Sequence, residues 1–106
     1  MVAIDPSLKK GVLPLCVLAL LKKDRYGYEL VTEISRRFDM TEGTIYPLLR
    51  RMKSESFVDT YLLESSHGPA RKYYKLNSKG RKRLQQMKKE WIQFSKIIDD
   101  FIGEKK

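Results

Sequence analysis

The sequence predicts a mainly α-helical domain that carries one β-hairpin, and three observations support this fold class. Apolar residues recur with the 3.6-residue period of amphipathic helices over most of the 106 residues. The period changes to two between positions 57 and 76, as expected for β-strands. The length is that of a single domain, so we expect all of these elements to share one core.

The first predicted helix runs from Pro6 to about Lys23. Asp5 is a favourable N-cap, and the missing N–H of Pro6 costs nothing at the first helical position. Apolar residues occupy nearly all sides of the segment, which predicts the central core helix. Its apolar run, 12–21, contains Pro14 and is well short of the roughly 20 residues of a membrane span. No signal peptide precedes it, so we expect a cytoplasmic protein without a membrane partner.

Cys16 lies inside this apolar run and is the only cysteine of the chain. A single cysteine excludes a disulfide within the chain and a cysteine-cluster zinc site. The apolar neighbours predict a small buried side chain with a raised thiol pKa, and they disfavour the alternative of a reactive thiol.

Two further helices joined by a very short turn are predicted next. The first covers Tyr26 to Phe38, and its buried stripe is Leu30, Val31, Ile34 and Phe38. The second follows Asp39-Met40, with Thr41 as the expected N-cap. Its buried stripe is Ile45, Leu48, Leu49 and Met52, and its opposite face carries Glu42, Thr44, Tyr46, Arg50, Arg51 and Lys53. Two helices with such a short connection, the second with a basic outer face, indicate a helix-turn-helix.

Pro47 conflicts with a regular second helix. A proline inside a helix costs about 3 kcal/mol, and less in the first turn. Two alternatives therefore stay open: the helix begins later than Thr41, or it bends at Pro47.

A two-stranded hairpin is predicted after this helix, with strands over 57–64 and 71–76 and a loop over 65–69. In the second strand one side carries Arg71, Tyr73 and Lys75, and the other carries Lys72, Tyr74 and Leu76. We expect Tyr74 to belong to the core. The hairpin completes a winged helix-turn-helix, and it must pack on the helices to be stable.

A long final helix is predicted from Ser78 to Ile102, with Asn77 as its cap. Its apolar residues are spaced alternately three and four apart, which is the pattern of a helix-pairing seam. The seam consists of Leu84, Met87, Trp91, Phe94, Ile98 and Phe101. Nothing else in the chain is large enough to bury this face, so we expect a homodimer. The expected division is a DNA-binding part, 1–77, and a C-terminal dimerisation helix, 78–106.

Charge supports a nucleic-acid partner. Lysine and arginine number 22 against 13 aspartate and glutamate, for a net charge of +9. Nine basic residues and no acidic residue lie between Gly68 and Lys89: Arg71, Lys72, Lys75, Lys79, Arg81, Lys82, Arg83, Lys88 and Lys89. Such clustering favours phosphate neutralisation, and we expect one continuous positive surface over the hairpin and the start of the last helix.

Three strings of the sequence resemble the PadR family of transcriptional regulators in order and spacing. They are Tyr26 to Leu30 (YGYEL), Glu42 to Met52 (EGTIYPLLRRM) and Gly68 to Leu76 (GPARKYYKL), and Gly80 also matches the family pattern. The resemblance covers about residues 10 to 100, and the single C-terminal helix is similar to that of the compact subfamily.

The resemblance implies a dimeric repressor of a palindromic operator in double-stranded DNA, with the second helix of the helix-turn-helix in the major groove. Carried over by position, the expected DNA contacts are Tyr26, Thr41, Glu42, Gly43, Thr44, Tyr46, Pro47, Arg50, Arg51, Lys53, Arg71, Lys72, Tyr73 and Lys75. Gly43 is expected to allow close approach. Family members usually have a glycine where this chain has Ser56, so we expect Ser56 to end the helix at some energetic cost.

Trp91 is the only tryptophan and lies in the middle of the seam. It is either a packing residue of the dimer or, as the resemblance to some compact members implies, one wall of a site for a planar aromatic or drug-like ligand. Asp99 and Asp100 could supply negative charge for a cationic ligand, or they are solvated helix positions.

Two rival functions fit the sequence less well than DNA binding. A winged helix used only for protein interaction has no need of nine unopposed charges around the hairpin. An enzyme is disfavoured because His67 is the only histidine and no catalytic or metal-ligand spacing is present, and no cofactor is expected.

Overall fold

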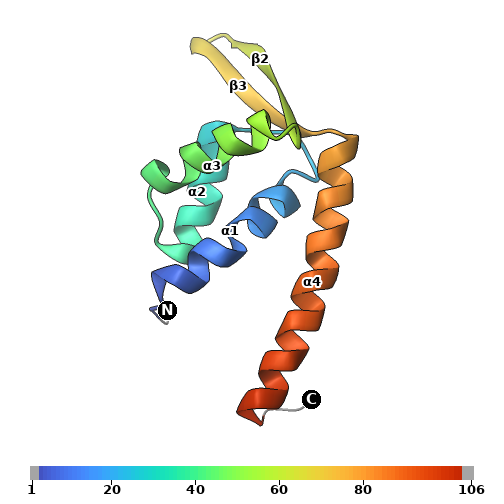
Figure 1. Cartoon of the computed structure of the whole chain (residues 1–106). Coiled ribbons are helices and arrows are strands. Elements are labelled where there is room, and N and C mark those ends of the chain that lie inside the picture. The colour runs from blue at the N-terminus through green and yellow to red at the C-terminus, as the bar shows by residue number, and fades with distance from the viewer. Residues whose placement is uncertain (1–2, 104–106) are drawn as a thin grey trace.

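The computed structural model describes residues 3–103, and the elements within that range confirm the predicted fold class. They are α1 (Pro6–Leu20), β1 (Arg25–Tyr26), α2 (Gly27–Phe38), α3 (Glu42–Ser54), β2 (Val58–Ser65), β3 (Gly68–Leu76) and α4 (Ser78–Ile102). Helices α1 to α3 pack together beneath the β2–β3 hairpin, while α4 starts at the hairpin's base and leads away from it (Figure 1). The expected domain limits at Met1 and Lys106 lie outside the described residues.

Helix α1 is the central helix, as predicted, and buries Leu13, Val17 and Leu18. The Asp5 carboxylate accepts the Ser7 N–H at 2.8 Å and so caps the helix as expected. The helix ends at Leu20, three residues before the predicted Lys23, because the chain turns there toward β1. No helix within residues 3–103 is both long and apolar enough to cross a membrane.

Cys16 is half-buried rather than fully buried. Burial raises the pKa of its thiol, as predicted, and the positive charge of Arg37 offsets this in part. The thiol is therefore a poor nucleophile at neutral pH.

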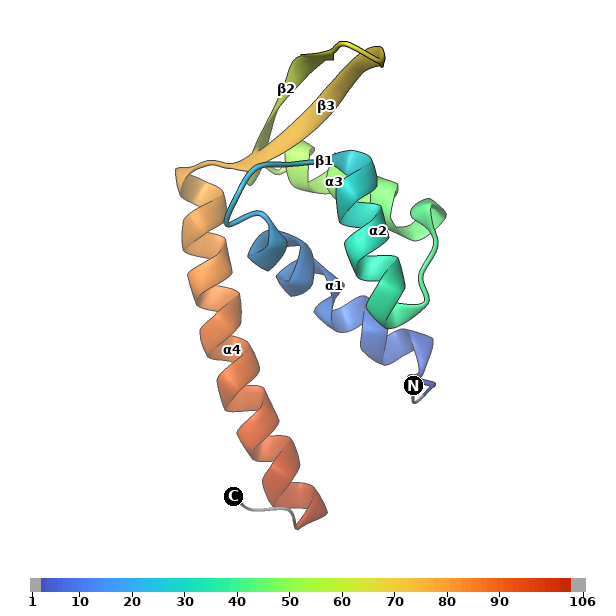
Figure 2. The same cartoon turned by 180° about the vertical axis from the view of Figure 1, so that it is seen from behind.

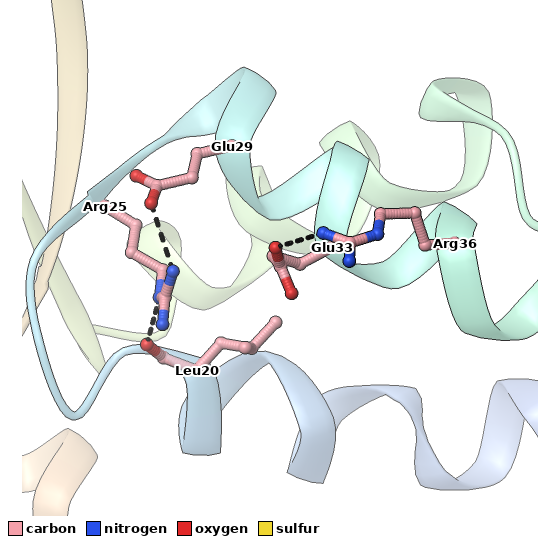
Figure 3. A network of polar contacts seen from close by, with 5 residues as sticks. All are labelled: Leu20, Arg25, Glu29, Glu33 and Arg36. Atoms are coloured by element: carbon pink, nitrogen blue, oxygen red, sulfur yellow. Dashed lines mark hydrogen bonds and ion pairs between the residues drawn. The ribbon is translucent and has the colours of Figure 1, made fainter.

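Strand β1 was not predicted, and it makes the expected two-stranded hairpin a three-stranded antiparallel sheet of order β1-β3-β2. Arg25 pairs with Tyr74 and Tyr26 with Tyr73. Figure 3 shows how the Arg25 guanidinium joins the end of α1 to the start of α2: it donates to the Leu20 carbonyl at 2.7 Å and to Glu29 at 3.0 Å. A second ion pair in the same view, Arg36 to Glu33, lies on the exposed face of α2.

The hairpin is longer than predicted. Ser65 pairs with Gly68, so the turn between β2 and β3 is only two residues long, in place of the expected loop over 65–69. The strands accordingly begin at Val58 and Gly68 rather than at 57 and 71. Tyr74 and Leu76 are buried on one face of β3, which confirms the predicted alternation and the core position of Tyr74.

Helix α3 runs from Glu42 through Pro47 without interruption, so the alternative of a later start is wrong. Thr41 holds the extended N-cap conformation, although its side chain makes no capping hydrogen bond. Three predicted stripe residues of α2, Leu30, Val31 and Ile34, and all four of α3 are buried, whereas Phe38 is only half-buried. The helix-turn-helix is thus formed as the period predicted.

Ser56 ends α3 in the left-handed conformation, with φ of 64°. The Phe57 N–H bonds the Met52 carbonyl and the Ser56 N–H bonds the Lys53 carbonyl, both at 3.0 Å, which is a Schellman motif. This confirms the expected strain, because a left-handed conformation disfavours a residue with a Cβ atom.

Ser56→Gly is expected to raise the free energy of unfolding by about 0.5–1 kcal/mol, because glycine adopts the left-handed conformation without steric cost. Urea denaturation measures the change. The control is Ser54→Gly, two residues earlier at the end of the helix itself. That variant is expected to lose about the same amount, and equal effects of the two glycines would contradict the assignment.

Helix α4 has the predicted limits, and the Asn77 side chain accepts the Gly80 N–H at 2.8 Å. Its first turns pack against α1, so Leu84 is only 3% exposed and Met87 is half-buried. The expectation that the chain cannot bury the seam itself is therefore wrong for Leu84 and partly wrong for Met87. Figure 2 shows the second half of α4 standing apart from the other helices.

Candidate nucleic-acid interface

Helix α3 presents an exposed ridge opposite its buried stripe. Gly43, Pro47 and Arg50 lie on this ridge, which helical periodicity extends to Ser54. Arg50 makes no ion pair within residues 3–103, so its charge is available to a ligand. A Cβ atom at Gly43 would meet only the Thr41 hydroxyl, at 3.5 Å. The fold itself therefore does not require glycine at position 43.

The remaining predicted residues of α3 are less uniform. Thr41 and Glu42 are exposed at the start of the helix, and Lys53 is exposed near its end. Arg51 lies 3.9 Å from Glu55, an exposed pair that holds the side chain only weakly. Thr44 and Tyr46 were expected on the outer face and are half-buried. Tyr46 is turned toward the start of α2 and β3.

A row of tyrosine rings crosses the sheet beside Arg71. The Arg71 guanidinium lies 4.7 Å from the centre of the Tyr26 ring, and that ring is 5.7 Å from Tyr73. Tyr73 stacks on Tyr61 at 5.5 Å, and the Tyr61 hydroxyl donates to Asp24 at 2.7 Å. This hydrogen bond raises the pKa of Tyr61. The row fixes Arg71 and braces the hairpin against the body of the domain.

Asp24 and Tyr61 were missed in the sequence because the residues that they join lie on different strands and carry no periodic signal. Arg71, Lys72 and Lys75 are exposed on β3, as predicted. The hairpin is therefore a basic ribbon whose orientation is fixed by stacked rings.

The predicted continuous basic surface is only partly formed. Near the hairpin, the Lys79 ammonium donates to the Glu55 carbonyl at 2.8 Å, and Arg81 donates to the Leu76 carbonyl at 3.2 Å. Lys88 and Lys89 lie about 15 Å further along α4, which leads away from the hairpin (Figure 1). These two lysines are not part of one surface with the hairpin.

A cavity of about 290 Å³ opens where the start of α2, α3 and β3 meet, and we call it the tyrosine cavity. It is lined by Tyr26, Gly27, Tyr28, Tyr46, Arg71, Lys72 and Tyr74. Burial raises the pKa values of Tyr46 and Tyr74, with smaller contributions from Glu42 and Tyr28 at Tyr46 and from Tyr46 at Tyr74. Both hydroxyls are therefore protonated at neutral pH and can donate hydrogen bonds.

The second half of α4 carries the part of the seam that this chain leaves uncovered. Trp91 is 44% exposed, Phe94 54% and Phe101 84%, and Ile98 is exposed beside them. The Trp91 and Phe94 ring centres are 6.3 Å apart. Asp100 is nine residues from Trp91, about two and a half turns, so it projects from the opposite side of the helix. Within one chain it cannot supply charge beside the indole.

Comparison with known proteins decides which family has this arrangement. The family described as "Transcriptional regulator PadR-like family" matches residues 17–86, which is most of the chain. The chain belongs to the PadR family. A PadR-like transcriptional regulator from Bacillus cereus is 37% identical with a TM-score of 0.82, over 91% of this chain and 96% of that one.

Other relatives match the PadR chain over similar shares of its length. A PadR family transcription regulator from Clostridium difficile is 35% identical with a TM-score of 0.79, over 87% of this chain and 99% of that one. An uncharacterised protein from Lysinibacillus sphaericus is 39% identical over 98 residues, 88% of this chain and 90% of its own. This PadR protein is therefore a DNA-binding transcription regulator and not an enzyme.

Proposed function

We propose that the protein is a sequence-specific repressor that binds a palindromic operator as a homodimer and is released by a small aromatic or drug-like ligand. The observation that carries the DNA-binding part is Arg71, which is exposed on the hairpin and held over the Tyr26 ring. Repression and relief by a ligand rest on the resemblance to the family. A repressor of this kind acts in the cytoplasm, where its operator is.

In the proposed complex, the ridge of Gly43, Pro47 and Arg50 faces the major groove. The exposed start of α3 lies at the groove floor, and the absence of a side chain at Gly43 allows close approach. Arg50, Arg51 and Lys53 lie further along the helix and contact the backbone more readily than the bases. The hairpin adds phosphate contacts from Arg71, Lys72 and Lys75, with Tyr73 supporting them.

Arg71→Ala is expected to weaken binding to every duplex and to flatten the dependence of log K on log salt by about one unit for each phosphate that the variant no longer neutralises. Fluorescence anisotropy with a labelled duplex, repeated over a range of salt concentrations, measures both quantities. Lys96→Ala is the matched control because it removes the same charge from an exposed position of α4 far from the hairpin. A slope as steep as that of the unchanged protein would exclude Arg71 from the interface.

The proposed dimer forms through the second half of α4. Trp91, Phe94, Ile98 and Phe101 make an exposed apolar stripe, and such stripes are rare on monomeric proteins. A second copy of this chain is the occupant, since two identical stripes are self-complementary about a two-fold axis. Residues 1–77 then bind DNA and residues 78–106 join the protomers, while Leu84 and Met87 complete the core of their own chain.

We place the effector at Trp91, whose ring is exposed near the middle of this stripe. Two indoles near a two-fold axis pack poorly, and a gap walled by aromatic rings suits a planar guest. Asp99 is half-buried on a neighbouring part of the helix surface and supplies negative charge for a cationic ligand. Asp100 contributes only if the partner protomer brings it to the site. The ligand must bind one arrangement of the dimer more tightly, because equal binding shifts no equilibrium.

Planar cationic dyes and phenolic acids are expected to quench the Trp91 fluorescence in a saturable way. The signal is specific because the chain has no second tryptophan. Trp91→Ala should abolish dye binding, measured by dye anisotropy, while Ile92→Ala on the same exposed turn should retain it. Dye binding that survives in the Trp91 variant would leave this residue with a packing role only.

A further inference from the structure

The start of α2 faces the tyrosine cavity without an acceptor from its own capping residue. Tyr26 occupies the N-cap position but makes no side-chain hydrogen bond to the helix. The first N–H groups of a helix have no partner within the helix, and they carry its positive partial charge. This end of α2 therefore offers free donors at one wall of the cavity.

Gly27 is what brings these donors close to the tyrosines. It is the first residue of α2 and is buried. A Cβ atom at this position would lie 3.0 Å from the Tyr46 ring, 3.4 Å from the Tyr74 ring and 3.6 Å from the Tyr46 hydroxyl. Both rings thus close around the helix start, so that donors from α2, α3 and β3 converge on one small volume.

The Tyr74 hydroxyl is an independent sign of a ligand. The residue is only 6% exposed, yet its hydroxyl makes no hydrogen bond within residues 3–103. In the same range no completely buried side-chain nitrogen or oxygen lacks a partner. The Tyr74 hydroxyl is therefore reached from outside, and the cavity that it lines provides the opening. A donor placed in this way needs an acceptor from outside the chain.

We propose that the tyrosine cavity binds a phosphate group of the DNA backbone, a site that rests on the proposed DNA-binding function and extends it to Gly27, Tyr28 and Tyr74. Arg71 and Lys72 bring two positive charges, and no carboxylate lines the cavity. The phenol hydroxyls and the start of α2 donate hydrogen bonds. Such a combination of helix N–H groups, cations and hydroxyls matches the oxygen atoms of a phosphate.

The location makes this site an anchor between the two DNA-contacting elements. The cavity joins Tyr46 of α3 to Arg71 and Lys72 of the hairpin. A phosphate held here fixes the depth at which α3 enters the groove relative to the hairpin, because phosphate contacts set the register of a protein on a duplex. The contact does not depend on base sequence.

Nuclear magnetic resonance of the full-length, nitrogen-15-labelled protein tests the proposal directly. Inorganic phosphate is the first probe, and a short duplex at low salt is the second. Both are expected to shift the amide signals of Gly27, Tyr28 and Glu29 in a saturable way. In anisotropy measurements Tyr74→Phe, which keeps the ring and removes the hydroxyl, should raise the Kd for the duplex about fivefold.

Two further variants keep the result interpretable. Tyr28→Phe changes an exposed residue of the cavity, cannot disturb the core, and should also raise the Kd. Tyr61→Phe is the control, since its hydroxyl is bonded to Asp24 outside the cavity, and it should change the Kd less than twofold, or about 0.4 kcal/mol.

The outcomes separate this site from the proposed function. A duplex that binds without moving the three amide signals, or Tyr74→Phe behaving like Tyr61→Phe, overturns the phosphate site and leaves DNA binding intact. Signals that respond to inorganic phosphate but not to the duplex assign the cavity to a free anion and overturn the backbone contact. Failure of the unchanged protein to bind any duplex at low salt overturns the proposed function itself.

Discussion

Replacing Phe94 and Ile98 together by aspartate is expected to convert the protein from a dimer to a monomer. Both side chains are exposed in the single chain and lie on the proposed interface. A dimer of the variant would bury four carboxylates without partners, and each buried charge costs several kcal/mol. The dissociation constant of the dimer should therefore rise by more than about 10³-fold. Sedimentation velocity measures the change in mass.

The control for this variant carries the same charge change on the other side of α4. Gln86 and Gln93 are exposed on the polar face, so replacing both with aspartate should leave the dimer intact. Binding to a palindromic operator should weaken only in the Phe94 and Ile98 variant, because a monomer occupies one half-site. A stable dimer of that variant would show that the protomers associate through another surface.

Gly80→Ala is expected to have the largest effect on stability. A Cβ atom at position 80 would lie 2.0 Å from the backbone oxygen of Phe57 and 3.0 Å from a methyl group of Leu76. Phe57 lies between the Schellman motif and β2, so its carbonyl cannot move without shifting both. We expect the free energy of unfolding to fall by about 3 kcal/mol or more, the upper range for overpacking.

Gly11→Ala provides the comparison. Gly11 lies inside α1, and an added Cβ atom meets nothing within 4 Å. This variant should be more stable by about 0.5–1 kcal/mol, because alanine favours the helix and restricts the unfolded chain. Urea denaturation of both variants provides the test. If Gly80→Ala unfolds at the urea concentration of the unchanged protein, α4 is not packed against Phe57 as described.

Elements with a local signal were predicted well. Asn77 and the spacing from Leu84 to Phe101 located α4 to the residue, and Thr41 located the start of α3. Cap preference and helical period depend on residues a few positions apart, which is why sequence alone contains them. The left-handed Ser56 was predicted for a similar reason, since the family pattern places glycine there.

Features that depend on distant partners were not predicted. Strand β1 has two residues, too few for a period, and it exists because Arg25 and Tyr26 meet β3. The seam pattern could not distinguish Leu84, which faces α1 of its own chain, from Trp91, which is exposed. In the candidate interface, the residue types of the hairpin and α3 were predictable, while the hydrogen bond from Tyr61 to Asp24 and the turn of Tyr46 into the cavity were not.

The pairing of β1 with β3 also has a consequence for the order of folding. It joins Tyr26 to Tyr73, and so closes a loop that contains α2, α3 and β2. Closing a long loop costs chain entropy before its contacts repay it, whereas helices and the two-residue hairpin form from near neighbours within microseconds. The β1–β3 ladder is therefore expected to form last, and the stacking of Arg71 on Tyr26 with it. A nascent or partly folded chain has both helices of the helix-turn-helix but lacks the arginine in place, so the ability to grip a duplex arises only when folding is complete.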